Sequence, residues 1–263
     1  MYQALRCDAE KIARGAIAAV SPEAAVRRVL TGKTFSGRLY LVSVGKAGWK
    51  MAQAAVSCLE QPIEQGIVVT KYGHVEHPLP GIPCYEAGHP VPDENTFRAT
   101  QAVLDMTAQA SPEDTVLFLL SGGGSALFEK PLVEGAELQA ITNQLLASGA
   151  DIVEMNTIRK RLSAVKGGRF AQWCAPAHVE VIVLSDILGD PPDMIASGPA
   201  APDSSTCTDA LATVKKYDLT LSERALSLLQ QETPKELPNV STQIIGSVRQ
   251  LCHAAGQLAE ELG

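Results

Sequence analysis

The sequence predicts an α/β fold, in which a mostly parallel sheet carries helices on both faces. Short apolar runs typical of buried strands alternate with stretches whose apolar residues have helical spacing, as in strand–helix–strand units. Two of the apolar runs end in glycine turns. With 263 residues, 46% of them hydrophobic, the chain is long and apolar enough to bury the core of such a sheet.

The first thirty residues predict two helices. Helical spacing of apolar residues runs from 2 to 31 and is interrupted at Ser21-Pro22. A serine side chain can accept hydrogen bonds from the first amides of a helix, and proline suits the first helical position. The second helix is therefore expected to begin at Pro22.

Further strands and helices are expected in alternation along the rest of the chain. The expected strands are 39–44, 66–70, 116–120, 180–185 and 242–245, and the expected helices are 47–60, 94–109, 135–148, 208–230 and 247–262. The polar segment 232–239, with two prolines, is the best candidate for a linker. We place one domain at 1–240 and expect 241–263 to begin a second, truncated domain.

Composition excludes several classes of protein. A net charge of −7 without a Lys/Arg cluster argues against nucleic acid as the main partner. The chain has no run of 18 apolar residues and no basic-then-apolar start, so we expect a cytoplasmic protein with no membrane partner. The six cysteines contain no C-x-x-C pair, which favours ordinary reduced thiols over a zinc site or a disulfide framework.

The first glycine turn, Ser121-Gly-Gly-Gly-Ser125, follows the apolar run 116–120. Consecutive glycines let the backbone turn close to a ligand without Cβ clashes. Free amides in such a turn can bind a phosphate, and the hydroxyls of Ser121 and Ser125 add donors. The alternative is a plain glycine turn, so phosphate binding remains a hypothesis at this point.

The second glycine turn, Gly45-Lys46-Ala47-Gly48, follows the run 39–44. A lysine at the end of a strand, between small residues, is well placed to neutralise phosphate charge, although it also fits a solvated turn. Two better-known phosphate motifs are absent. Thr31-Gly-Lys-Thr34 lacks the first glycine of a Walker loop, and neither glycine turn completes G-x-G-x-x-G.

Acidic residues follow the apolar run 180–185. Asp186, Asp190 and Asp193 lie within eight residues, in a loop that glycine and proline restrict. Carboxylates at this spacing can hold a hydrated Mg²⁺ near substrate phosphates, but acidic loops are also common as solvent-facing turns. Asp186, at the strand end, is the best candidate, and Asp190 is the next.

Two further segments offer candidate ligand contacts. The basic segment 154–169 contains Arg159 and Lys166, which could hold a carboxylate or a phosphate, or form a solvated helix face. His89, between Gly88 and Pro90, could act as a general base or contact a substrate, or could brace its loop through hydrogen bonds.

Taken together, these segments resemble the glycerate 2-kinase family, whose members carry the MOFRL domain and whose relatives were often labelled hydroxypyruvate reductases. The resemblance lies in the blocks Val44-Gly-Lys-Ala47, Glu86-Ala-Gly-His-Pro-Val-Pro-Asp93, Ser121-Gly-Gly-Gly-Ser-Ala-Leu127, Ser148-Gly-Ala150, Asn156-Thr-Ile-Arg-Lys160, Leu162-Ser-Ala-Val-Lys-Gly-Gly-Arg169, Ser185-Asp186, Gly189-Asp190 and Ile195-Ala-Ser-Gly-Pro199. Several ordered blocks are far more specific than one glycine turn.

The resemblance implies a Rossmann-like domain and the ATP- and Mg²⁺-dependent phosphorylation of D-glycerate at its 2-hydroxyl, giving 2-phosphoglycerate. Lys46 would neutralise phosphate charge, and Asp186 or Asp190 would hold the metal or accept the hydroxyl proton. Arg159, Lys166 and His89 would contact the substrate. The nucleotide phosphates would lie against Gly45, Ser121, Gly122, Gly123, Gly124 and Ser125.

The family's complete members continue into a second domain that ends in the MOFRL region, and we expect this chain to be truncated before it. A separate chain carrying that domain is a candidate partner. Three functions therefore stay open: a glycerate kinase polypeptide whose activity alone is in question, an oxidoreductase acting on hydroxypyruvate, and a non-catalytic nucleotide-binding remnant.

Overall fold

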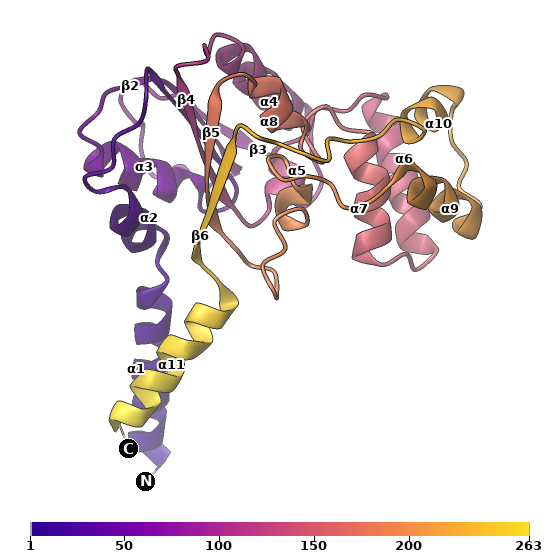
Figure 1. Ribbon diagram of the computed structural model, residues 1–263. Helices are drawn as coiled ribbons and strands as arrows, with labels where there is room; N and C mark the ends of the chain where they lie inside the picture. Colours follow the sequence, from indigo (N-terminus) through magenta and orange to yellow (C-terminus); the bar gives the residue numbers. More distant parts are fainter. Residues whose placement is uncertain (1, 263) are drawn as a thin grey trace.

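A six-stranded sheet with every strand parallel forms the core of the computed structural model, which describes residues 2–262 (Figure 1). The strands are β1 (Leu39–Val44), β2 (Ile63–Lys71), β3 (Cys84–Ala87), β4 (Thr115–Ser121), β5 (His178–Leu184) and β6 (Val240–Gly246). They lie in the order β3-β2-β1-β4-β5-β6. The expected α/β fold is confirmed, and the continuous apolar runs reflect strands covered on both faces.

The other elements of the described chain are helices. They are α1 (Tyr2–Ala19), α2 (Pro22–Leu30), α3 (Gly48–Cys58), α4 (Glu94–Thr107), α5 (Gly124–Leu127), α6 (Gly135–Ala147), α7 (Ile152–Arg161), α8 (Arg169–Cys174), α9 (Cys207–Tyr217), α10 (Glu223–Leu229) and α11 (Val248–Leu262), with a 3-10 turn η1 at Ile195–Ser197. None of the helices within residues 2–262 combines the length and the apolar character that crossing a bilayer requires.

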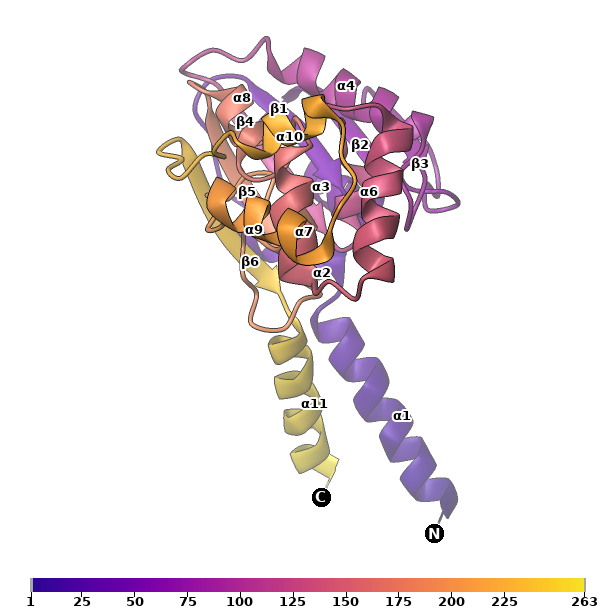
Figure 2. The same cartoon turned by 90° about the vertical axis from the view of Figure 1, so that its right-hand side faces the viewer.

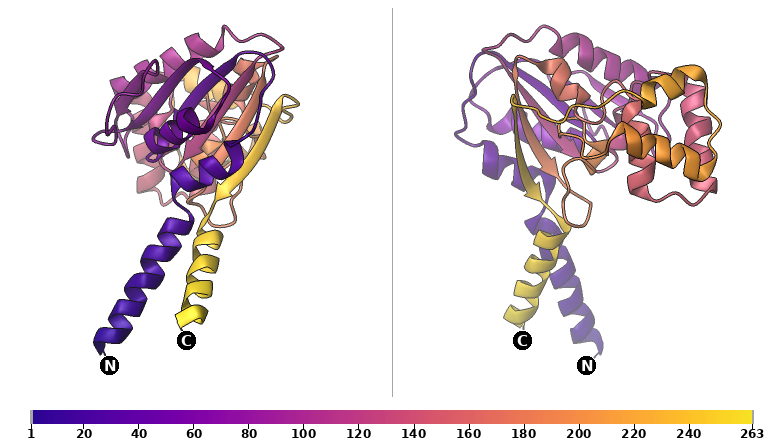
Figure 3. Two further views of the ribbon diagram at one scale, coloured as in Figure 1. Left: turned by 90° about the vertical axis from the view of Figure 1, so that its left-hand side faces the viewer. Right: turned by 45° about the vertical axis from the view of Figure 1, so that its right-hand side comes forward.

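Side chains of each strand alternate between two hydrophobic cores. Leu41 and Leu117 pack on the face covered by α2 and α3, with Trp49 of α3. Tyr40 and Phe118 pack on the opposite face, which α4 and α8 cover (Figure 3). The sheet is therefore buried from both sides, as the sequence predicts.

The helices α6, α7, α9 and α10 form a separate group beside the sheet, with their own core (Figure 1). The single helix expected over 208–230 is wrong, because the structure has α9 and α10 there. Asp218 adopts a left-handed conformation, φ 47°, that ends α9, and the Ser222 side chain caps α10 by accepting a hydrogen bond from the Ala225 amide.

The ends of the described chain lie side by side. Helices α1 and α11 pack against each other and project away from the sheet (Figures 1 and 2).

The predicted cap at the start of α2 is present, because Ser21 Oγ accepts a hydrogen bond from the Ala24 amide at 3.3 Å. The strand expected to open a second domain is β6, which pairs with β5 in the main sheet. A domain beyond it stays a prediction.

The strand β3 has no counterpart among the expected strands. It has only four residues, Cys84–Ala87, and it lies at the edge of the sheet, where three of them are half-exposed. So short a run carries no long apolar pattern to detect.

Candidate functional site

The strand order places a crevice between the ends of β1 and β4. These two strands are neighbours, but the chain leaves β1 toward β2 on one side and leaves β4 toward β5 on the other. Ligands of open α/β sheets bind where connections diverge in this way, outside the carboxyl ends of the strands. Both predicted glycine turns begin here, at Gly45 and at Gly122.

Direct contacts join the two turns. The Lys46 amide donates to the Gly122 carbonyl at 2.8 Å, and the Ala47 amide donates to Ser121 Oγ at 3.0 Å. The hydroxyl of Ser121 in turn donates to the Val44 carbonyl at 3.3 Å, and this side chain is buried. Ser121 therefore ties β1 to β4, and its contact with phosphate stays a prediction.

The turn after β4 has backbone amides that make no hydrogen bond to any described residue. Within the described residues, no acceptor is bonded to the amides of Gly122 and Gly123. A Cβ on Gly122 would lie 2.0 Å from Asp186 Oδ2, and one on Gly123 would lie 3.0 Å from the His89 ring and 3.2 Å from the Lys46 side chain. Lys46, His89 and Asp186 therefore lie beside the two glycines whose amides are unbonded.

The charges at this point are accessible. Lys46 Nζ lies 3.9 Å from Asp186 Oδ2, and the two side chains are 45% and 54% exposed. So loose and exposed an ion pair contributes little to stability, and both groups can exchange it for contacts with a ligand. An open pocket of about 310 Å³ adjoins them, and its lining includes Gly122, Ser185 and, from the other end of the chain, Ser247 and Val248.

His89 has a perturbed environment. Partial burial lowers the pKa of its imidazole below the ordinary 6.5, and the nearby cations Lys46 and Lys71 lower the pKa further. The ring beside Gly123 is consequently neutral at neutral pH, so it has one nitrogen free to accept a proton or a hydrogen bond.

Two of the predicted basic contacts hold Ser125 by its backbone. Lys166 is completely buried, and its Nζ donates to the Ser125 and Phe128 carbonyls, each at 2.8 Å, and lies 3.1 Å from Glu129 Oε2. Burial lowers the pKa of Lys166 to about 8, against the opposing effect of Glu129. Arg159 Nη2 donates to the same Ser125 carbonyl at 3.2 Å.

The side chain of Ser125 is bonded to residues that received no role from the sequence. Ser125 Oγ lies 3.1 Å from Ser197 Oγ, which donates to Asn156 Oδ1 at 2.9 Å. Ser197 and Ala196 have φ values of 62° and 52°, an uncommon conformation outside glycine that is often found at functional sites. The blocks at 156–160 and 195–199 contained both residues, but only the fold shows that they meet.

The acidic loop contributes unequally. Asp186 faces Gly122, whereas the structure brings Asp190 into contact with neither Asp186 nor Lys46 within its described part. Asp190 Oδ1 is buried without a hydrogen-bond partner. No cluster of three or more His, Cys, Asp or Glu side chains in residues 2–262 could enclose a metal ion. Single carboxylates suit Mg²⁺, which keeps several waters and is completed by substrate phosphates.

The fold and the crevice define the class of protein: a doubly wound parallel α/β protein with two glycine turns at its ligand-binding edge. Within that class, the chain belongs to the family described as a domain of unknown function (DUF4147), whose model matches residues 8–230.

Similar proteins carry two kinds of name. A protein of Thermotoga maritima named D-glycerate 2-kinase is 52% identical over 263 residues, which are 99% of this chain and 63% of that protein. A putative hydroxypyruvate reductase of Agrobacterium vitis is 41% identical over 229 residues, 86% of this chain and 52% of that protein. The crystal structure of a Thermotoga maritima glycerate kinase matches with a TM-score of 0.94 and 52% identity, and it covers 99% of this chain and 63% of that one. The resemblance to the glycerate 2-kinase family is confirmed, and the chain spans less than two thirds of these relatives.

Proposed function

We propose that this chain provides the phosphate-binding part of a kinase that transfers the γ-phosphoryl group of ATP to the 2-hydroxyl of D-glycerate, giving 2-phosphoglycerate. The name of the Thermotoga maritima relative at 52% identity, D-glycerate 2-kinase, supports the reaction. The observation that carries the proposal is the approach of Lys46 to Asp186, 3.9 Å apart, at the bare glycine turn of the crevice.

The cationic side of the crevice binds the nucleotide phosphates in this proposal. The free amides of Gly122 and Gly123 donate to phosphate oxygens, and the ammonium of Lys46 neutralises the charge on the transferred group. Phosphoryl transfer needs mainly such positioning and charge neutralisation. Arg159 and Lys166 contribute by holding the backbone of Ser125 in place, since both donate hydrogen bonds to its carbonyl.

The acidic side of the crevice serves the acceptor. The 2-oxygen of glycerate attacks the γ-phosphorus, the bond from that phosphorus to ADP breaks, and the hydroxyl proton passes to Asp186 or to the neutral imidazole of His89. Asp186 is also the carboxylate best placed to hold Mg²⁺, with Asp190 the further candidate. Bound there with the phosphates, the metal would offset their negative charge.

Two coupled assays test the proposal. Purified chain is assayed for D-glycerate-dependent formation of ADP and, separately, for NAD(P)H oxidation with hydroxypyruvate. Both are repeated with the part of the Thermotoga maritima relative that this chain does not match, supplied as a second polypeptide. ADP formation in either format supports the kinase. Oxidation of NAD(P)H contradicts it, and binding of nucleotide without turnover in both formats leaves a non-catalytic binding protein as the function.

The pH dependence of kcat/KM tests His89. Since the pKa of His89 is lowered, its imidazole stays neutral down to a pH below 6.5, and activity that needs the neutral ring falls only below that point. The variant His89→Gln keeps a hydrogen-bonding side chain but cannot titrate, so we expect it to lose this acidic limb and about 10- to 100-fold of activity. His253→Gln, on the exposed face of α11, is the control. An acidic limb that persists in His89→Gln would assign the titration to another group.

A further inference from the structure

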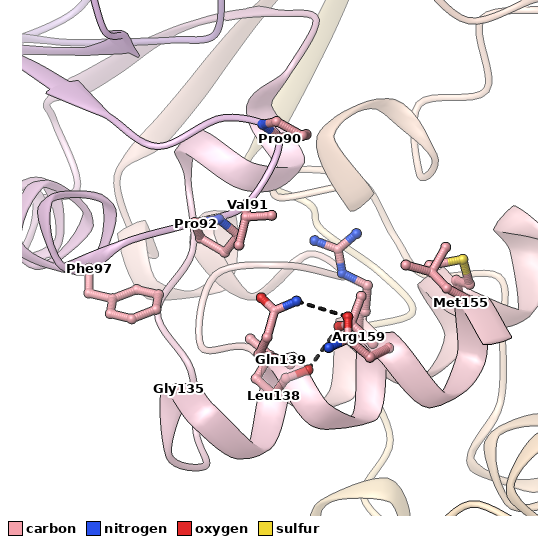
Figure 4. Close-up of a pocket in the computed structure, with 12 residues that line it drawn as sticks. Pro90, Val91, Pro92, Phe97, Gly135, Leu138, Gln139, Met155 and Arg159 are labelled. Carbon is pink, nitrogen blue, oxygen red and sulfur yellow. Dashed lines mark hydrogen bonds between the residues drawn. The ribbon is translucent and has the colours of Figure 1, made fainter.

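A second cavity lies beside the glycine turn, on the side of α6 and α7. It encloses about 300 Å³ between the loop at 90–92, the start of α4 and the two helices (Figure 4). Its apolar lining comes from Pro90, Pro92, Phe97, Leu138, Leu146 and Met155. We call it the proline-loop pocket.

Two residues place the proline-loop pocket next to the proposed phosphate-binding turn. His89, whose ring lies against the Gly123 Cα, directly precedes Pro90 in the lining. At the other end, Arg159 lines the pocket and donates to the Ser125 carbonyl. Along the turn, Gly122 lies beside Asp186 and Gly123 lies beside His89. Ser125 is joined to the pocket by its hydrogen bond from Arg159.

The apolar walls suit one part of the proposed ligands. Glycerate carries an oxygen on each of its three carbons, so it has no apolar surface to bury. The adenine ring of ATP has two apolar faces, and prolines, Phe97, Leu138 and Met155 offer apolar surface to both. The pocket therefore favours the nucleotide base over the acceptor.

Two amide side chains at the rim match the hydrogen-bonding edge of adenine. Gln139 Nε2 donates to Asn143 Oδ1 at 3.1 Å, and both residues line the pocket. This contact leaves Gln139 Oε1 as an acceptor and Asn143 Nδ2 as a donor. Adenine presents the complementary pair, its N6 amino group as donor and its N1 as acceptor.

Arg159 supplies the charge between the pocket and the turn. Its Nη2 is bonded to Ser125, but its Nε is buried without a hydrogen-bond partner among residues 2–262, which costs free energy. Figure 4 shows the guanidinium reaching from α7 toward the loop that carries Pro90 and Val91. A ribose or α-phosphate oxygen there would give the guanidinium an acceptor.

We propose that the proline-loop pocket binds the adenine of ATP, with Gln139 and Asn143 reading its edge and Arg159 placed between the base and the phosphates. This inference rests on the kinase function proposed above. It directs the nucleotide to the α6–α7 side of the glycine turn and leaves the pocket beside Asp186 to the acceptor.

Filling the pocket tests this assignment by calorimetry with two probes, ADP and inorganic tripolyphosphate. Val91 is 51% exposed on the loop, so Val91→Trp adds bulk to the pocket with little effect on the core. We expect it to raise the dissociation constant of ADP by about tenfold or more and to leave that of tripolyphosphate within about twofold. The matched control is Val153→Trp, at a 56% exposed valine outside the pocket, which should change neither value.

A second pair of variants tests base recognition. Hypoxanthine reverses the polarity of the adenine edge, so wild-type protein should bind ADP about fivefold or more tighter than IDP. Gln139→Leu and Asn143→Leu should each bring that ratio close to one. Circular dichroism spectra and unfolding midpoints confirm that each variant is folded.

The outcomes separate the two proposals. Unchanged ADP affinity in a folded Val91→Trp variant, or equal loss of ADP and tripolyphosphate binding, overturns the adenine assignment while the phosphate site stands. So does an ADP-to-IDP ratio that the amide variants leave unaltered. Failure of wild-type protein to bind either probe overturns the kinase proposal, and the adenine assignment with it.

Discussion

Replacing Lys46 by alanine is expected to lower the turnover of the proposed glycerate kinase reaction by about 100- to 1,000-fold, the loss that follows removal of one preorganised charge-stabilising group. Lys46 is the cation at the bare Gly122–Gly123 turn, and its ammonium is 3.9 Å from Asp186 Oδ2. Negative charge on the transferred phosphoryl group would lose its nearest counter-charge. ADP affinity should fall less than kcat, because the ground state keeps its amide contacts.

The control for this variant is Lys50→Ala. Lys50 is 48% exposed on α3, pairs with Glu23 and Glu76, each at 3.6 Å, and does not line the pocket beside Lys46 and Asp186. Exposed pairs of this kind contribute little, so turnover should stay within about twofold of wild type. Full activity and full nucleotide affinity in Lys46→Ala would show that this lysine has no part in the site.

Replacing Gly45 by alanine is expected to destabilise the protein by about 3 kcal/mol or more. Gly45 has φ +120°, a conformation that side chains rarely adopt, and a Cβ there would lie 2.2 Å from Ser121 Oγ and 2.5 Å from the Ser121 carbonyl oxygen. Relief of this clash requires the turns after β1 and β4 to separate. The bonds from Lys46 to Gly122 and from Ala47 to Ser121 would then break.

Urea unfolding of Gly45→Ala and of Gly73→Ala separates the clash from the backbone strain. Gly73 also has a positive φ, +78°, but a Cβ there would meet nothing within 4 Å. We expect Gly73→Ala to cost only about 1 kcal/mol, the strain of the backbone conformation alone. Equal losses of unfolding free energy in the two variants would mean that the turns after β1 and β4 move apart easily to accommodate a Cβ. The link between β1 and β4 would then not be rigid.

The sequence predicted the strands β1, β2, β4 and β5 because each contains an apolar run long enough to be recognised, and it also predicted β6, whose first half is polar and exposed. It missed the edge strand β3, which is short and half-exposed. It also joined α9 and α10, because apolar spacing continues past Asp218, where the backbone turns left-handed. Helix spacing reports which residues face a core, and it is insensitive to one residue that changes direction.

For the candidate site, the glycine turns and Asp186 were identified from residue type and position at strand ends. The roles of the individual polar side chains were harder to predict from the sequence. Ser121 and Lys166 have polar groups of the right chemistry, but both are buried, and their donors bond to backbone carbonyls. Ser197 and Asn156 lie 41 positions apart in the chain, and only folding makes them neighbours.

By itself, the sequence determined the class of fold and which turns can approach a ligand, because these depend on local periodicity and on glycines that must lack a Cβ. The family came from the resemblance of its ordered motif blocks. The tertiary structure alone decided which of the polar residues face the crevice. Strand order brings Gly45 and Gly122 to one edge, and packing buries Lys166 while leaving Lys46 and Asp186 open. Such choices depend on contacts between distant segments, and no local pattern of residues encodes them.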